Sequence, residues 1–298
     1  MRARTASPMT NEPLDMSLFT KSRKADYWND FYQNPASVFE HTMAQRRDYA
    51  HRYICGNFPK SARLLDLGCG AGVLSEQLLR SGYRVTCADA SEDMLELARR
   101  RLSTCPSPPE AVVRADIRNL PFEDSTFDLV ICMGVFGYFD EVEAALAQVR
   151  RVLVPGGVYI MSIRNPYNLY LCELGLLPWR LCRFVGKKIS RGLSRAAKQG
   201  PASVSSWRLP PADAAAFRVA IHTDPRAVIA GIEQRGFKLI EFDGLGYGPP
   251  TVFGKEFLPA TWSMKLSDGL ADLFRRTGLH RRTRWFADVS FYTFCTGD

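Results

Sequence analysis

The chain lacks the sequence patterns of several protein classes. Its eight cysteines include no CxxC pair and no Cys/His spacing of the kind that binds zinc, so neither a metal site nor a disulfide framework is predicted. The longest nearly unbroken apolar run, Leu129 to Phe139, has 11 residues and is too short to span a membrane. The first 16 residues lack the apolar stretch of a signal peptide. We therefore expect a cytoplasmic protein that uses no metal.

Acidic residues are missing from one segment, which concentrates the positive charge of the chain. The net charge is +8, and the segment from Leu174 to Ala212 contains eight basic residues and no acidic one. Without these eight, the chain has 31 basic and 31 acidic residues, so the whole excess belongs to this segment. The composition, with 46% hydrophobic and 23% charged residues, is that of a globular protein of one large or two modest domains.

From Arg63 onward, apolar strand-like runs alternate with helical segments. We expect strands at 63–67, 83–89, 111–116, 127–135, 158–163, 237–243 and 289–296. Helices are expected at 73–80, after Ser91 as N-cap, at 141–153 before Pro155 and Gly156, and between Pro225 and Gly236. This alternation is typical of a parallel sheet that helices cover on both faces. The predicted fold class is therefore α/β.

The predicted core is interrupted by two insertions. Residues 1–16 are expected to be disordered and 17–60 to form a helical lead-in, in which a helix begins after Asn34 and ends near Gly56. The core comprises 61–164 and 224–298, with irregular insertions at 165–223 and 244–286. Each insertion follows the carboxyl end of a strand, which is the edge where open α/β sheets bind ligands. We therefore expect the insertions to form the pocket for a second substrate.

A glycine-rich turn joins the first predicted strand to the first helix of the core. Gly68, Gly70 and Gly72 alternate with other residues in LLDLGCGAG, which lets the backbone approach a ligand before a helix N-terminus. A dinucleotide fingerprint would require glycine at position 73, which is Val73. Acidic residues end the next two strands, in CADAS and RADIR, where they can bind a ribose and an exocyclic amine. An adenosine-containing ligand is therefore predicted.

The combination of DLGCGAG, CADAS, RADIRNLPF, FDLV and VLVPGG closely resembles the class I S-adenosylmethionine-dependent methyltransferases of the small-molecule type. Matching elements cover close to half of the chain. The resemblance implies a Rossmann-like, doubly wound and mostly parallel sheet of seven strands, with an antiparallel last strand and helical cap insertions. It also implies S-adenosyl-L-methionine as the cofactor.

The resemblance implies roles for nine residues at the ends of four strands. Gly68, Gly70 and Gly72 would line the methionine part of the cofactor, and Asp66 would lie near its amino group or orient the turn. Asp89 would bind the ribose hydroxyls.

The remaining implied contacts lie at the next two strand ends. Asp116 and Ile117 would hold the adenine, and Met133 and Gly134 would lie under the sulfonium. Ordinary structural roles are the alternative for several of these residues, since Asp66 can simply cap the turn and Met133 can belong to the core.

A general base is needed only if the acceptor must lose a proton. Of the four histidines, His222 precedes the predicted helix at Pro225 and lies near the crevice, and His41 lies on the lead-in helix. Both are candidate catalytic bases, although a single histidine is more often a structural hydrogen-bonding group. A nucleic-acid acceptor is disfavoured because the chain has no [DN]-P-P-[YF] motif after the fourth strand and no Pro-Cys dipeptide.

Segment 177–198 has the pattern of an amphipathic helix with a cationic face. Apolar residues recur every four positions from Leu181 to Leu193, and six basic residues lie on the other side. This pattern is typical of an element that contacts an anionic membrane or an anionic, lipid-like substrate. A lid helix with solvated charges is the alternative.

The leading hypothesis is an O-methyltransferase that acts on a hydrophobic or amphipathic small molecule, such as a lipid, a quinone-like compound or a secondary metabolite. Aromatic residues are numerous around the expected pocket, which favours an apolar acceptor: Tyr27, Trp28, Phe31, Tyr32, Phe136, Tyr138, Phe139, Tyr247, Phe253, Phe257 and Trp262. Alternatives are a sugar or glycolipid methyltransferase, or a non-catalytic regulatory protein that binds the cofactor. The sequence leaves the acceptor atom and the oligomeric state open.

Overall fold

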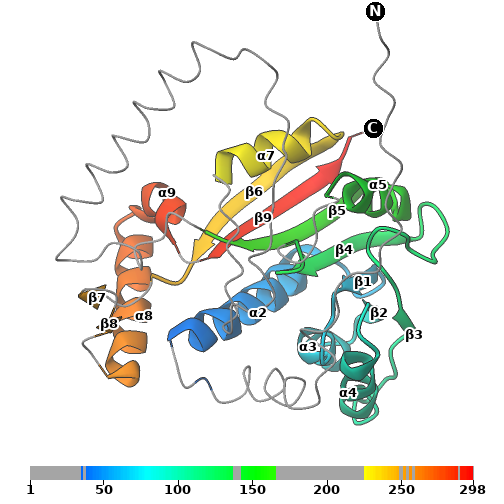
Figure 1. Cartoon of the computed structure of the whole chain (residues 1–298), viewed down its shortest axis with the longest axis horizontal. Coiled ribbons are helices and arrows are strands. Elements are labelled where there is room, and N and C mark those ends of the chain that lie inside the picture. Colours follow the sequence, from blue (N-terminus) through cyan, green and yellow to red (C-terminus); the bar gives the residue numbers. More distant parts are fainter. Residues whose placement is uncertain are drawn as a thin grey trace, which may run out of the picture.

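The computed structural model of the chain describes residues 35, 38–136, 142–165, 225–247, 251–252, 255–256, 259–287 and 289–297. These residues form a twisted sheet with helices on both faces (Figure 1). The seven strands of the sheet are β1 (Arg63–Leu67), β2 (Arg84–Asp89), β3 (Ala111–Arg114), β4 (Phe127–Met133), β5 (Leu153–Arg164), β6 (Phe237–Leu245) and β9 (Val289–Thr296). A separate hairpin joins β7 (Thr251–Val252) to β8 (Lys255–Glu256).

The strand order is β3-β2-β1-β4-β5-β9-β6. Strands β1 to β5 pair in parallel, whereas β9 is antiparallel to both of its neighbours, β5 and β6. Strand β6 therefore runs in the same direction as β5, and its carboxyl end lies at the same edge of the sheet as those of β1 to β5. The predicted α/β fold, with seven strands and an antiparallel last strand, is confirmed.

Helices cover the two faces of the sheet and create two apolar cores. Successive strand residues point to opposite faces, so Leu64 and Ile131 belong to one core and Leu65 and Val130 to the other. The first core is closed by α2 (Val38–Asn57), α3 (Val73–Arg80) and α4 (Glu92–Leu102). The second is closed by α5 (Val142–Val152) and α7 (Pro225–Glu233).

The helices near the glycine-rich turn begin and end close to their predicted positions. Helix α3 has the predicted bounds, Val73 to Arg80, and the Ser91 hydroxyl accepts a hydrogen bond from the Met94 N–H at the start of α4. The lead-in helix α2 ends at Asn57, close to the predicted Gly56. Its predicted N-cap, Asn34, lies outside the described residues.

Strand β5 begins earlier than predicted. The sequence placed a break at Pro155 and Gly156 and a strand from Val158, but Leu153 already pairs with Phe127. The register then shifts, so that the next pair joins Leu129 to Val158. Proline has no N–H to donate and is tolerated in a sheet at such an irregularity, which is where this Pro-Gly pair lies.

Insertion 244–286 is helical, as the family resemblance implied, and not irregular, as the hydrophobicity pattern predicted. It contains α8 (Ala260–Arg276), α9 (His280–Thr283) and a 3₁₀ turn, η3 (Arg284–Phe286). The fully buried residues of α8 are Ser263, Ser267 and Ala271, whereas three of its large apolar residues, Trp262, Leu266 and Leu273, are exposed. Small polar residues on the packed face hide the helical period from a hydrophobicity pattern.

Figure 1 shows α8 and α9 beside the end of β6. No helix among the described residues is long and apolar enough to cross the lipid bilayer. The first insertion, apart from Asn165, and residues 1–16 lie outside the described residues, so their predicted organisation stays a prediction.

Candidate cofactor site

The three glycines of the turn all have left-handed backbone conformations, with φ of 75° at Gly68, 54° at Gly70 and 74° at Gly72. A Cβ atom on Gly68 would lie 2.2 Å from Val135 Cγ2, and one on Gly72 would lie 3.2 Å from Ala98 Cβ. A Cβ on Gly70 would meet nothing within 4 Å. Gly68 and Gly72 therefore allow close packing, while Gly70 borders open space in which a ligand can approach the backbone.

The amino end of α3 is available to an anionic or polar ligand. Gly72 is its N-cap residue, and no side chain caps it. Within the part of the chain that the structure describes, no side chain accepts from the first N–H groups of the helix, which lie directly after the turn. This is the arrangement predicted from the glycine spacing.

Asp89 joins the glycine-rich turn to the turn after β2. Its Oδ2 accepts a hydrogen bond of 2.8 Å from the Gly70 N–H, and its Oδ1 accepts one of 2.9 Å from the Ser91 N–H. Burial raises the pKa of Asp89, and these backbone donors act in the opposite direction. Each carboxylate oxygen keeps a second lone pair, so the predicted contact with ribose hydroxyls is compatible with this geometry.

Asp66 lies beneath the turn rather than on its surface. Its side chain is 3% exposed, and its Oδ2 accepts a hydrogen bond of 2.5 Å from the Ser75 hydroxyl in α3. Burial raises the pKa of Asp66 to about 6; the Ser75 hydroxyl lowers it, and the nearby Asp89 charge raises it further. These contacts favour the turn-orienting alternative for Asp66.

The adenine contacts predicted at Asp116 and Ile117 have a partner that the sequence reasoning missed. The Arg118 guanidinium donates to both carboxylate oxygens of Asp116, at 3.0 and 2.6 Å. Burial would raise the pKa of Asp116, but the hydrogen bonds from Arg118 lower it below 3.8. Ile117 is 4% exposed and belongs to the core, so little of its side chain can face a ligand.

At the end of β4, helix α2 contributes a second residue that the sequence reasoning missed. Gly134 has a φ of 76°, and a Cβ on it would lie 2.3 Å from Arg46 Nη1. The same nitrogen donates to the Ser162 hydroxyl at 3.5 Å. Met133 packs at the border of the core on this face. A cation therefore lies over the strand ends where the sulfonium end of the cofactor was predicted.

The structure describes only one of the two histidines that were predicted as candidate bases. His222 lies outside the described residues. His41 Nε2 is 2.9 Å from Asp268 Oδ1, which joins α2 to α8. The catalytic role of each stays a prediction.

The aromatic residues expected around the pocket are largely structural where the structure describes them. Phe136 is buried beside Tyr159, and Tyr247 packs edge-on against Phe274. Trp262 is exposed on α8. Among the described residues, these three give no support to an aromatic pocket, and Tyr27, Trp28, Phe31, Tyr32, Tyr138, Phe139, Phe253 and Phe257 have no described side chains.

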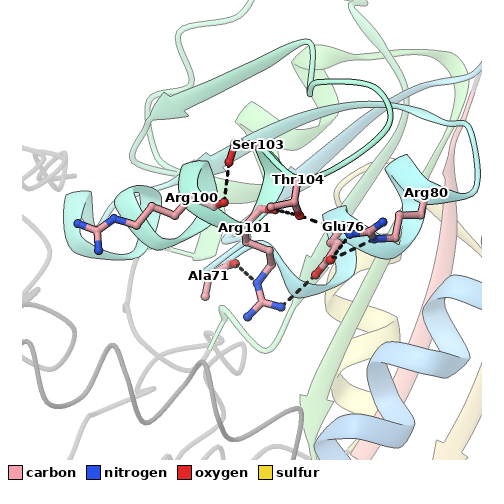
Figure 2. Close-up of polar contacts among 7 residues, drawn as sticks. All are labelled: Ala71, Glu76, Arg80, Arg100, Arg101, Ser103 and Thr104. Atoms are coloured by element: carbon pink, nitrogen blue, oxygen red, sulfur yellow. Dashed lines mark hydrogen bonds and ion pairs between the residues drawn. The ribbon is translucent and has the colours of Figure 1, made fainter.

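Arg101, near the end of α4, forms a hydrogen bond to the backbone of the glycine-rich turn (Figure 2). Its Nε donates to the Ala71 carbonyl at 3.0 Å, and its Nη1 donates to Glu76 in α3 at 3.0 Å. Glu76 also pairs with Arg80. The Arg101 side chain is largely buried, so these charge-assisted bonds are shielded from water. Arg101 therefore connects the turn to two helices.

Comparison with known proteins supplies the family. Residues 65–161 match the model of a methyltransferase domain. The ubiquinone biosynthesis O-methyltransferase of Ruegeria pomeroyi is 31% identical over 189 residues, which are 57% of this chain and 71% of that protein. The chain belongs to the class I S-adenosylmethionine-dependent methyltransferases. The predictions of this family and of its cofactor, S-adenosyl-L-methionine, are confirmed.

Two further methyltransferases are similar to this chain, one over a shorter stretch of sequence and one at lower sequence identity. The demethylmenaquinone methyltransferase of Clavibacter sepedonicus is 39% identical over 120 residues, which cover 37% of this chain and 47% of that one. The chain spans about half the length of several such curated relatives. A solved magnesium protoporphyrin IX methyltransferase from Synechocystis, 17% identical with a TM-score of 0.53, covers 94% of this chain and 97% of its own, and shares the fold.

The described residues fit the family's cofactor. Gly70 leaves room beside the backbone, the N-terminus of α3 is uncapped, and Asp89 keeps acceptor capacity beside both. Asp116 fits less simply, because an adenine amine would share its oxygens with Arg118.

Proposed function

We propose that the protein transfers a methyl group from S-adenosyl-L-methionine to a hydroxyl oxygen of a hydrophobic or amphipathic small molecule. The observation that supports it is the hydrogen bond from the Gly70 N–H to Asp89, which links the turn after β1 to the turn after β2. Gly70 borders open space, and the uncapped N-terminus of α3 follows the first turn. The relatives named for ubiquinone and demethylmenaquinone favour a lipid or quinone-like acceptor.

When bound, S-adenosyl-L-methionine supplies an electrophilic methyl group on a sulfonium. Asp89 would hold the ribose hydroxyls, Arg46 would hold the carboxylate, and the turn would fix the orientation of the ligand. Alignment of the two reactants accounts for most of the acceleration, because positioning alone can lower a barrier by about 7 to 11 kcal/mol. His222 would accept the proton that the acceptor hydroxyl loses as its C–O bond forms and the C–S bond of the methyl donor breaks.

The insertions 165–223 and 244–286 form the acceptor pocket in this proposal. Segment 177–198 contacts an anionic membrane surface, so the protein works at the cytoplasmic side of a membrane, where an amphipathic acceptor would reside.

The test is to incubate lipid and polar extracts with the protein and isotopically labelled cofactor, and to follow the label by mass spectrometry. We expect label in an apolar or amphipathic product. Asp89→Ala should weaken cofactor binding by ~10²-fold or more, because hydrogen bonds to a charged group contribute about 1.5 to 3 kcal/mol each. Asp128→Ala, which removes an exposed partner of Arg63 at the other end of the sheet, is the control.

Three outcomes would contradict the proposal. Label in a sugar product would favour the glycolipid alternative, and cofactor binding without any transfer would favour a regulatory protein. Unchanged cofactor affinity in a folded Asp89→Ala variant, measured by calorimetry, would remove the assigned ribose contact.

A further inference from the structure

Helix α8 carries a row of large apolar side chains that face away from the protein. Trp262 is 68% exposed, Leu273 is 51% exposed and Leu266 is 39% exposed. At 3.6 residues per turn, these three positions lie within about 40° of one another around the helix axis. We call them the α8 stripe. Three aligned apolar residues, one of them a tryptophan, are not explained by packing within the described residues.

The orientation of α8 is fixed by its opposite side. Ser263, Ser267 and Ala271 are buried there, and the Ser267 hydroxyl accepts a hydrogen bond of 3.1 Å from the Tyr247 N–H. Asp268, on a flank of the helix, contacts His41 and Gln45 of α2. The stripe is therefore held outward by contacts on other sides of the helix.

Cations flank the stripe and continue beyond it. Between Ala260 and Thr283 the chain has five basic and two acidic residues. Both acids have partners, because Asp268 contacts α2 and Asp272 lies 3.6 Å from Arg275. No ion pair is recorded within the described part of the chain for the other four cations, which are Lys265, Arg276, Arg281 and Arg282. The surface around the stripe is thus both apolar and cationic.

We propose that the α8 stripe and its flanking cations lie on an anionic lipid surface. A helix with tryptophan and leucine on one side and Lys or Arg beside them is suited to the membrane interface, where the apolar side chains enter the acyl boundary and the cations meet lipid phosphates. A second copy of the chain fits less well, since a symmetric contact would bring like charges together. The residues of this surface are distinct in sequence from segment 177–198.

Helix α8 places this surface near the sheet edge at which we propose that the cofactor binds. The helix follows β6 at its carboxyl end and packs on α2, the helix that brings Arg46 over Gly134. Docking through α8 would therefore turn that edge toward the lipid. The inference does not rest on methyl transfer, because lipid binding is measured without cofactor or acceptor.

The experiment is co-sedimentation of the full chain with phosphatidylcholine vesicles, with and without phosphatidylglycerol. We expect binding only to the anionic vesicles, and weaker binding as salt screens the cations. Trp262→Ser combined with Leu266→Ser and Leu273→Ser should weaken binding by ~10-fold or more, since the buried apolar area is lost. Ile240→Ser, which alters another exposed apolar residue, on β6, is the matched control and should bind as the wild type does.

A second measurement reports on Trp262 directly. Brominated lipids should quench tryptophan emission of the wild type more than that of Trp262→Phe. Unchanged vesicle binding of the triple-serine variant, with loss of binding in Arg183→Glu, Lys187→Glu and Arg191→Glu combined, would overturn the proposal in favour of segment 177–198. Self-association that the stripe variant abolishes, without vesicle binding, would overturn it in favour of a second copy.

Discussion

At the scale of single residues, His222 and His41 are the two candidates for the base. His41 is paired with Asp268 across α2 and α8, which assigns it at least a structural contact. His222→Ala should lower turnover by ~10²-fold or more and leave cofactor affinity unchanged, because a general base acts on the chemical step. The measurement is initial rate at saturating cofactor, together with calorimetric affinity.

His41→Ala, assayed in parallel, separates the two candidates. A large loss of turnover in His41→Ala with near-normal turnover in His222→Ala would transfer the role of base to His41. Near-normal turnover in both folded variants would show that the reaction needs no base, as expected for an acceptor that is already ionised.

Some site residues follow from the sequence and others do not, for a physical reason. Asp89 ends a strand 19 positions after Gly70, and parallel strands bring their carboxyl ends together, so its contact with the Gly70 N–H could be expected. Arg46 reaches Gly134 from a helix packed across the sheet, and no local pattern encodes that approach. Arg118 pairs with Asp116 only because the backbone turns back at this point, where Asp116 and Asn119 form a bridge.

At the scale of elements, the position of α4 relative to the glycine-rich turn depends on Arg101. Arg101→Leu removes the donors to the Ala71 carbonyl and to Glu76 (Figure 2). We expect about tenfold weaker binding of the cofactor, since the loss of a hydrogen bond to a charged group costs ~1.5 to 3 kcal/mol and part is recovered by water. Calorimetry with S-adenosylmethionine tests this expectation.

Arg99→Leu is the matched control for Arg101→Leu. Arg99 lies on the same helix and pairs with Glu92 on the exposed side, away from the turn. It should bind the cofactor normally. If a folded Arg101→Leu variant binds the cofactor as tightly as Arg99→Leu does, the contact with Ala71 has no part in ligand binding. Arg101→Lys should then also bind the cofactor with that same affinity.

Helices were predictable where their apolar residues face the core. In α3 the buried residues include Leu74 and Leu78, four positions apart, and the bounds were predicted correctly. In α8 three large apolar residues, Trp262, Leu266 and Leu273, face outward and two serines face inward, so the same reasoning predicted an irregular segment. The failure coincides with the surface that we propose to contact lipid, as expected where function opposes the usual pattern.

At the scale of the whole molecule, we expect two carboxylates of the candidate cofactor site, Asp66 and Asp89, to lower the stability of the fold at neutral pH. Asp66 is buried and Asp89 is half-buried, and burial raises the pKa of each carboxyl. The Asp89 charge adds to the cost of ionising Asp66. Without the cofactor, the protein therefore has two neighbouring carboxylates at the glycine-rich turn, Asp66 beneath it and Asp89 beside it.

This arrangement predicts how global stability depends on pH. The pKa of Asp66 is 3.8 for an ordinary aspartate and about 6 in the fold, so between these values the folded state binds more protons than the unfolded state. The free energy of unfolding should therefore fall by up to about 3 kcal/mol, from this residue, as pH rises through that window. In urea unfolding of the cofactor-free protein, Asp66→Asn should gain stability relative to wild type across the same window. Asp128→Asn should instead be less stable than wild type above pH 3.8, and this difference should shrink only as pH falls below that value, because Arg63 lowers the pKa of Asp128. A stability difference between Asp66→Asn and wild type that is equal at every pH would contradict the burial of an ionisable carboxylate beneath the turn.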